Sequence, residues 1–197
     1  RTVELVVAVI PAQGDPLPDP IVYLEGGPGG SGISGIDAWY NSPYRAGRAI
    51  IIFDQRGTGF STPSLNCPEL DDAENPDAVE ACRDRLLGQG VDLTAYNSRE
   101  NAADVEALRQ ALGYDQVNLY GISYGSRLSL TMMRDHAGAV RSAIIDAVFP
   151  PQANLNEEIA LNVERGLKAV FEDCAADAGC DETYPDLQAT FYRVVDD

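Results

Sequence analysis

The segment Val117-Asn118-Leu119-Tyr120-Gly121-Ile122-Ser123-Tyr124-Gly125 decides the fold. An apolar strand pattern at 117–120 runs into Gly-x-Ser-x-Gly, and a helical pattern follows from Ser123 to about His136. A serine on a tight strand-to-helix turn presents its hydroxyl to solvent, and the flanking glycines leave room for neighbouring backbone. The segment therefore predicts that Ser123 is a nucleophile; the alternative is a serine that only caps an ordinary helix.

Strand and helix patterns alternate on both sides of this segment. The strand patterns cover residues 3–10, 21–24, 49–53, 117–120 and 140–148, and the helical patterns cover 98–112 and 123–136. We expect Ser98 to cap the first of these helices and Gly113 to follow its end. Residues 62–97 are irregular and acidic and predict an excursion over the surface. The alternation predicts an α/β fold with a mostly parallel sheet and helices on both faces.

The pattern changes after Pro151, and from Asn154 onward it is helical only. We therefore expect residues 1–151 to form the N-terminal part of an α/β core. Residues 152–197 are expected to begin a helical cap or lid.

A glycine-rich segment, Gly26-Gly27-Pro28-Gly29, directly follows the strand pattern at 21–24. A serine that attacks a carbonyl needs donors for the oxyanion, and small residues let backbone approach the substrate closely. One donor is expected to be the backbone N–H of Tyr124, which follows the serine. The second is expected to be the N–H of Gly27, since Pro28 has no N–H to donate.

Three motifs together resemble the α/β-hydrolase branch of prolyl and tripeptidyl aminopeptidases. They are Gly26-Gly27-Pro28-Gly29, Asp54-Gln55-Arg56-Gly57-x-Gly59-x-Ser61 and Gly121-x-Ser123-x-Gly125, in the family's order and each after a strand. The resemblance covers about residues 1–150 well and the remainder loosely. It implies an α/β-hydrolase fold and a serine exopeptidase that removes residues from free peptide N-termini beneath a helical cap. One departure is Glu25, where many relatives carry a histidine.

A serine hydrolase also needs a general base and an acid, which in this fold follow the serine in the order acid, then histidine. The only histidine is His136, on the same predicted helix as Ser123 and roughly 20 Å from it at about 1.5 Å per residue. The base and the acid are therefore expected beyond Asp197, either in a further part of the protein or in a second polypeptide. Asp146 is the alternative acid of a variant arrangement. We expect the isolated chain not to turn over.

Composition limits the partners. The chain has 197 residues, with 31 acidic against 14 basic side chains and a net charge of -17. Such a surface repels phosphate backbones and anionic lipid, so no nucleic-acid or membrane partner is expected. It favours amine-bearing partners such as a peptide, although acidic excess also serves solubility alone. No metal or organic cofactor is implied.

The four cysteines, Cys67, Cys82, Cys174 and Cys180, allow three disulfide pairings, of which neighbour pairing closes two short loops. No Cys-x-x-Cys is present and His136 is distant in sequence, which argues against a zinc site. Two disulfides would place the protein outside the cytoplasm, secreted or periplasmic. The alternative is four reduced, buried thiols. The start at Arg1 lacks a signal-peptide pattern, which suggests a mature or trimmed product.

Other functions fit parts of the sequence. Gly27-Pro28-Gly29-Gly30-Ser31-Gly32 followed by Asp54 fits an NAD-binding fingerprint, but Pro28 removes a donor and no clean helix follows. A carboxylesterase or lipase would use the same serine. A non-catalytic binding module would keep the turn without the chemistry. Trp39, Tyr40 and Tyr44 follow the glycine-rich segment, and they fit equally the lining of a substrate cleft and packing on the core.

Overall fold

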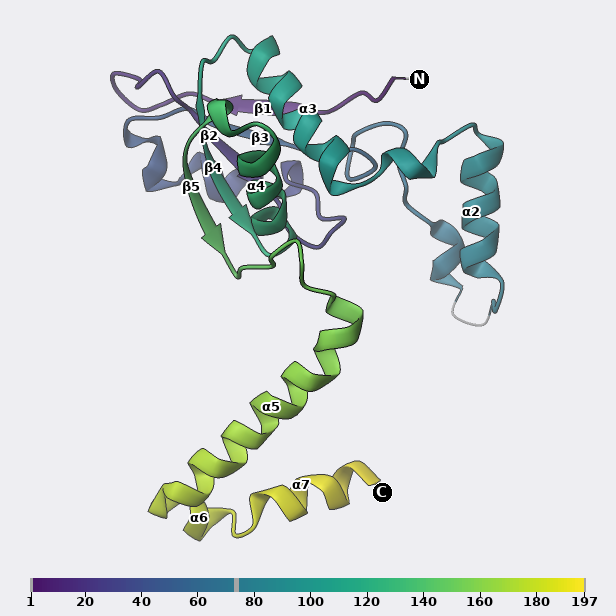
Figure 1. Ribbon diagram of the computed structural model, residues 1–197, viewed down its shortest axis with the longest axis vertical. Coiled ribbons are helices and arrows are strands. Elements are labelled where there is room, and N and C mark those ends of the chain that lie inside the picture. Colours follow the sequence, from purple (N-terminus) through teal and green to yellow (C-terminus); the bar gives the residue numbers. More distant parts are fainter. Residues whose placement is uncertain (1, 73–74, 197) are drawn as a thin grey trace. The chain divides into compact units, whose positions relative to one another are not determined.

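The computed structural model describes residues 2–72 and 75–196 (Figure 1). The chain divides into two units, Arg1–Pro151 and Gln152–Asp197, which are described separately below. The first contains the sheet and the second contains helices only. That the second unit begins a cap stays a prediction.

The sheet of the first unit has the strand order β1-β3-β2-β4-β5. Its strands are β1 (Val7–Ile10), β2 (Ile21–Leu24), β3 (Ile50–Phe53), β4 (Val117–Ile122) and β5 (Val140–Asp146). Only the β1–β3 pairing is antiparallel; β2, β3, β4 and β5 run parallel. The predicted mostly parallel sheet is therefore confirmed. The loops at the carboxyl ends of β2, β3 and β4 meet at one edge of the sheet, where such folds place their sites.

The described residues form seven α-helices. They are α1 (Ile36–Tyr40), α2 (Ala78–Gly88), α3 (Ser98–Ala111), α4 (Tyr124–Asp135), α5 (Leu155–Ala176), α6 (Ala178–Thr183) and α7 (Leu187–Asp196). Short 3-10 turns cover Ile33–Gly35, Pro43–Ala46, Pro68–Asp71, Leu93–Ala95 and Ala137–Ala139.

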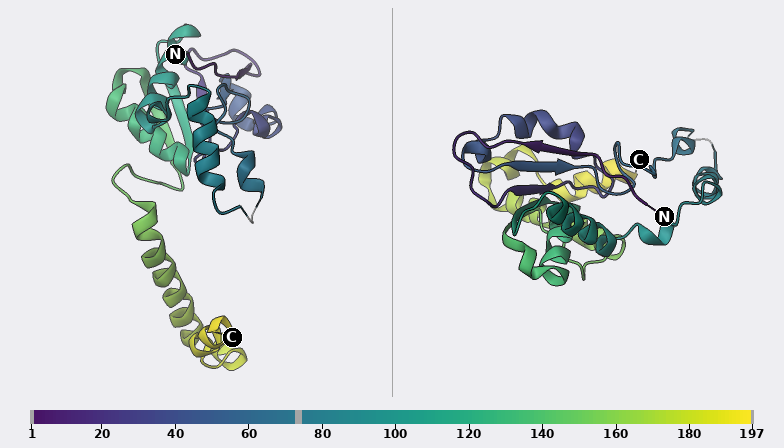
Figure 2. Two further views of the ribbon diagram at one scale, coloured as in Figure 1. Left: turned by 90° about the vertical axis from the view of Figure 1, so that its right-hand side faces the viewer. Right: turned by 90° about the horizontal axis from the view of Figure 1, so that it is seen from above.

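Apolar clusters lie on both faces of the sheet. The larger one joins the sheet to α3 and α4 through Val22, Leu24, Ile51, Phe53, Ala102, Val105, Val117, Leu119, Tyr124, Leu128 and Met132. The smaller one joins Ile10, Ile21, Tyr23, Ile50 and Ile52 to the segment around α1. Figure 2 shows helical segments on both sides of the strands. This arrangement follows from strands that are apolar on both faces.

The start of α3 differs from expectation by one residue. Asn97, not Ser98, is the N-cap, and its side-chain oxygen accepts from the N–H groups of Arg99 and Glu100, each at 3.0 Å. The prediction of Ser98 as the cap was wrong because two adjacent residues can both cap a helix. Gly113 follows the end of α3 with φ 78°, as a glycine after a helix commonly does.

The structure joins Cys67 to Cys82 and Cys174 to Cys180, which is the neighbour pairing. The first disulfide anchors α2 and lies in a small apolar cluster with Leu86 and Val91. The described part of the expected excursion, residues 62–72 and 75–97, carries one helix and two 3-10 turns. Among the described residues, no helix is both long and apolar enough to cross a membrane.

Candidate active site

Ser123 occupies the turn between β4 and α4. Its backbone has φ 54° and ψ -116°, a left-handed region that a residue with a side chain rarely adopts. Its N–H donates to the backbone oxygen of Asp146 at 2.9 Å, which ties the turn to the end of β5. The first turn of α4 follows immediately, so the partial positive charge of a helix N-terminus lies beside the serine.

Neighbouring backbone atoms leave no room for a side chain at Gly121 and Gly125, the two glycines that flank Ser123. A methyl group at Gly121 would overlap the backbone oxygen of Gly125, and one at Gly125 would overlap the backbone oxygen of Leu24. These neighbours are backbone atoms of the sheet and of α4, so they cannot move aside cheaply. The close approach is the physical reason for the Gly-x-Ser-x-Gly pattern at this point.

Ser126 holds the turn from the other side, a role that the sequence did not reveal. Its hydroxyl donates to the backbone oxygen of Ser123 at 2.6 Å and accepts from the N–H of Phe149 at 2.8 Å. The residue is fully buried. The only signal in the sequence was a second serine one helical turn after the first, a spacing that ordinary helices also show.

The glycine-rich segment lies directly against the serine. A Cβ at Gly26 would be 3.1 Å from Cβ and 3.6 Å from Oγ of Ser123. Gly27 follows with φ 112°, which favours glycine. The structure thus brings this segment and Ser123 together, as expected for an oxyanion site, with Gly26 in contact. Donation to an oxyanion by Gly27 and Tyr124 stays a prediction.

Glu25 holds the glycine-rich segment in place. Its carboxylate accepts from the N–H of Gly26 at 2.7 Å and from the hydroxyl of Tyr23 at 3.0 Å. Burial raises the pKa of Tyr23, and the Glu25 carboxylate raises it further. Tyr23 therefore stays a neutral donor at physiological pH. The residue that departs from the family pattern here supports the loop.

The loop after β3 is tied to the glycine-rich segment by Asp54, which is fully buried. Its carboxylate accepts from the hydroxyl of Ser31 at 2.8 Å, and from the N–H groups of Ile33 at 3.1 Å and Phe60 at 2.8 Å. Gln55 donates from Nε2 to the backbone oxygen of Glu25 at 2.9 Å. Asp54 is thus engaged by protein groups, which counts against a ribose-binding role.

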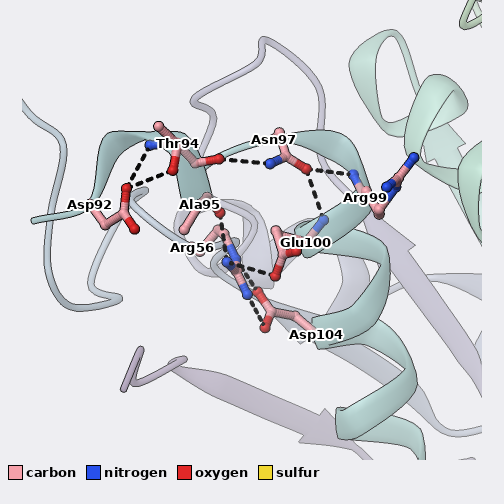
Figure 3. Close-up of polar contacts among 8 residues, drawn as sticks. All are labelled: Arg56, Asp92, Thr94, Ala95, Asn97, Arg99, Glu100 and Asp104. Carbon is pink, nitrogen blue, oxygen red and sulfur yellow. Dashed lines mark hydrogen bonds and ion pairs between the residues drawn. The ribbon is translucent and has the colours of Figure 1, made fainter. Parts of the chain in front are cut away.

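Arg56 connects the same loop to α3 (Figure 3). Its guanidinium makes two hydrogen bonds of 2.7 Å to the Asp104 carboxylate and one of 2.6 Å to the backbone oxygen of Ala95. Glu100 lies 3.6 Å away. The hydrogen bond to Asp104 raises the pKa of Arg56, so the group stays charged. This pair fixes the loop relative to the helix.

Tyr124 completes the link to α3. Its hydroxyl lies 3.1 Å from Oγ of Ser98 and accepts from Nδ2 of Asn101 at 3.1 Å. The Tyr124 side chain is 8% exposed and belongs to the large apolar cluster. The residue whose N–H is expected to face the oxyanion is therefore anchored through its side chain. The sequence did not reveal this use of Ser98 and Asn101.

The remaining predicted groups lie elsewhere. His136 is the C-cap of α4, and at about 1.5 Å per residue it lies roughly 20 Å from Ser123 at the other end of the helix. Asp146 is exposed, and its carboxylate lies 3.4 Å from the hydroxyl of Tyr120. Burial, and next the Asp146 carboxylate, raise the pKa of Tyr120. Within the described residues, nothing brings a histidine to Ser123.

Other candidates have structural explanations. Trp39 packs against Tyr23, Tyr44 and Tyr120, with ring centroids 4.4, 6.4 and 5.4 Å away, so packing on the core is the better interpretation. Cys67 and Cys82 lie near Glu69, but both sulfurs are in a disulfide and cannot bind a metal.

Comparison with known proteins places this geometry in context. The sequence matches the α/β hydrolase fold family over residues 19–194. It is 30% identical to serine protease Hip1 of Mycobacterium tuberculosis, covering 86% of this chain and 37% of the relative. It is 31% identical to a proline iminopeptidase of Xanthomonas citri, covering 69% and 34%. It is 29% identical to a tripeptidyl aminopeptidase of Streptomyces coelicolor, covering 71% and 31%.

Among solved structures, a marine microorganism esterase matches with a TM-score of 0.54 at 16% identity, over 97% of this chain and 62% of that one. An esterase from Exiguobacterium antarcticum matches with a TM-score of 0.51 at 19% identity, over 89% and 53%. These likenesses concern the fold. The chain spans well under half the length of the curated relatives named above.

Proposed function

Because the chain belongs to the α/β-hydrolase family, we propose that it is the N-terminal portion of a serine aminopeptidase acting on free peptide N-termini. The observation that carries the proposal is Ser123, held at φ 54° between β4 and α4 and packed against Gly26. This geometry serves acyl transfer and has no part in nucleotide binding. The named relatives include a proline iminopeptidase and a tripeptidyl aminopeptidase, which favours peptide over ester.

In the proposed reaction, Oγ of Ser123 attacks the carbonyl carbon of the scissile amide while a general base takes the hydroxyl proton. The oxyanion forms against the N–H groups of Gly27 and Tyr124, and the start of α4 favours its negative charge. The C–N bond then breaks, and the amine leaves with the proton returned by the base. Water hydrolyses the acyl-enzyme by the same route.

The general base and its acid are proposed to lie outside these 197 residues. His136 is held at the far end of α4, and it is the only histidine. The missing groups would come from a further part of the protein or from a second polypeptide. A helical unit from Gln152 onward would act as a cap over the serine.

The proposed location is outside the cytoplasm, in the periplasm or secreted. All four cysteines are in disulfides, which persist in oxidising compartments. A peptidase in that location would act on extracellular peptides.

The test compares three substrates on the full-length protein: a tripeptidyl aminomethylcoumarin with a free N-terminus, its N-acetylated form, and a p-nitrophenyl ester. The proposal predicts cleavage of the first, at least tenfold slower cleavage of the second, and loss of activity in Ser123→Ala. A preference for the ester would favour an esterase. Activity retained in Ser123→Ala would overturn the assignment of the nucleophile.

A further inference from the structure

A cleft of about 450 Å³ opens beside Ser123, on the side of α3. Three loops and the start of α3 and α4 line it, through Pro28, Gly29, Gln55, Arg56, Gly57, Thr58, Leu65, Asn66, Tyr96, Asn97, Ser98, Asn101 and Tyr124. Tyr124 directly follows the serine, and Pro28 and Gly29 continue the segment that contacts it. The volume is in the range of pockets that take small ligands or short peptide segments.

The lining mixes polar side chains with a larger area of carbon atoms, and it carries no free charge. Most side chains that line it bear a hydroxyl or an amide, and Leu65 is the one large aliphatic residue among them. The one charged residue in the lining is Arg56, and its guanidinium is held by the Asp104 carboxylate on α3. Such a surface suits a neutral ligand that both donates and accepts hydrogen bonds.

Asn101 gives this cleft a specific feature. The residue is 8% exposed, and its Nδ2 donates to the Tyr124 hydroxyl. Its Oδ1 is buried and has no hydrogen-bond partner within the described residues. Leaving such a group unpaired destabilises the folded state, so it calls for an explanation. The last torsion of an asparagine side chain is soft, so the amide can turn toward a donor in the cleft.

We propose that this cleft is a subsite for peptide main chain, and that Oδ1 of Asn101 accepts a main-chain N–H of the substrate. A peptide supplies the neutral donors and acceptors that the lining matches, whereas an aliphatic ester supplies no donor. The inference rests on the proposed function of Ser123. Asn101 is then a specificity-determining residue, whose amide exchanges its hydrogen bond to the Tyr124 hydroxyl for one to the substrate when it turns.

The experiment measures how fast two probes phosphonylate Ser123 in the full-length protein. One is a tripeptidyl diphenyl phosphonate and the other is a short alkyl fluorophosphonate. We expect Asn101→Leu to slow the peptidyl probe about five- to tenfold relative to the alkyl probe, because one hydrogen bond to substrate is lost. Asn101→Ala serves as the second variant if the leucine does not fold.

The matched control is Ser98→Ala, which removes the other partner of the Tyr124 hydroxyl and leaves Asn101 intact. If Asn101 acts only by anchoring Tyr124, both variants will change the two rates by the same factor, and the subsite is overturned. A selective loss with the peptidyl probe in Asn101→Leu alone supports it. If neither probe labels Ser123 in the unaltered protein, the proposed function itself fails.

Discussion

Two regions of the molecule differ in the contacts that stabilise them: the carboxyl edge of the sheet, and the helical unit from Gln152. At the edge, Asp54 is fully buried and hydrogen-bonded, and Gly125 lies too close to Leu24 to carry a side chain. In the helical unit, the buried side chains among the described residues are Phe171 and Cys174. One region depends on contacts between distant segments, and the other on helix formation, one disulfide and the packing of Phe171 against Phe191 and Tyr192.

This difference decides which substitutions each region tolerates. At the edge, a single added methyl group meets backbone that cannot yield. In α5, large apolar side chains such as Leu161 are exposed, at 66%. Substitutions at such exposed positions in α5 change the stability of the helix more than they change side-chain packing.

The largest expected difference in stability comes from making the same substitution, glycine to alanine, in each of the two regions. Gly125→Ala should lower the free energy of unfolding by about 3 kcal/mol or more, because its methyl group overlaps the backbone oxygen of Leu24. Gly166→Ala, inside α5 with nothing within 4 Å of the added group, should raise it by up to about 1 kcal/mol. Urea denaturation measures both. Equal effects would contradict the comparison.

A smaller effect is expected from the ion pair between Arg56 and Asp104. Arg56→Ala leaves a nearly buried carboxylate unpaired and should cost about 3 kcal/mol of unfolding free energy. The exposed pair between Arg83 and Asp84 is the control, since Arg83→Ala should change stability by less than about 0.5 kcal/mol. Similar losses in both variants would mean that Arg56 does not fix its loop.

The disulfide between Cys174 and Cys180 should stabilise the helical unit and not the sheet. Replacing Cys174 and Cys180 by serine opens a loop of 6 residues and should cost about 2 kcal/mol on the chain-entropy account. With so few buried side chains, that loss should increase hydrogen exchange in α5 and leave β4 protected. If hydrogen exchange rises equally in α5 and β4, the disulfide does not stabilise the helical unit selectively, and the contrast between the two regions is wrong.

The sequence predicted best where the signal is local. The strand, turn and helix around Ser123 follow from one segment because each element is encoded by its own residues. It predicted less well where two adjacent residues compete. Asn97 caps α3, while Oγ of Ser98 lies 3.1 Å from the hydroxyl of Tyr124.

Contacts between distant segments stayed hidden from the sequence. Nothing local indicates that Glu25 holds Gly26, that Ser126 bonds Phe149, or that Asn101 reaches Tyr124. These depend on how the loops at the sheet edge meet, which periodicity does not report. The close approach of Gly26 to Ser123 belongs to the same class.

The most direct test of the account is denaturing intact-mass spectrometry of the full-length protein after treatment with a fluorophosphonate. The account predicts one adduct per molecule, mapped to Ser123 by peptide analysis and absent in Ser123→Ala. An unlabelled protein, or an adduct on another residue, would contradict the claim that this strained turn presents a catalytic nucleophile.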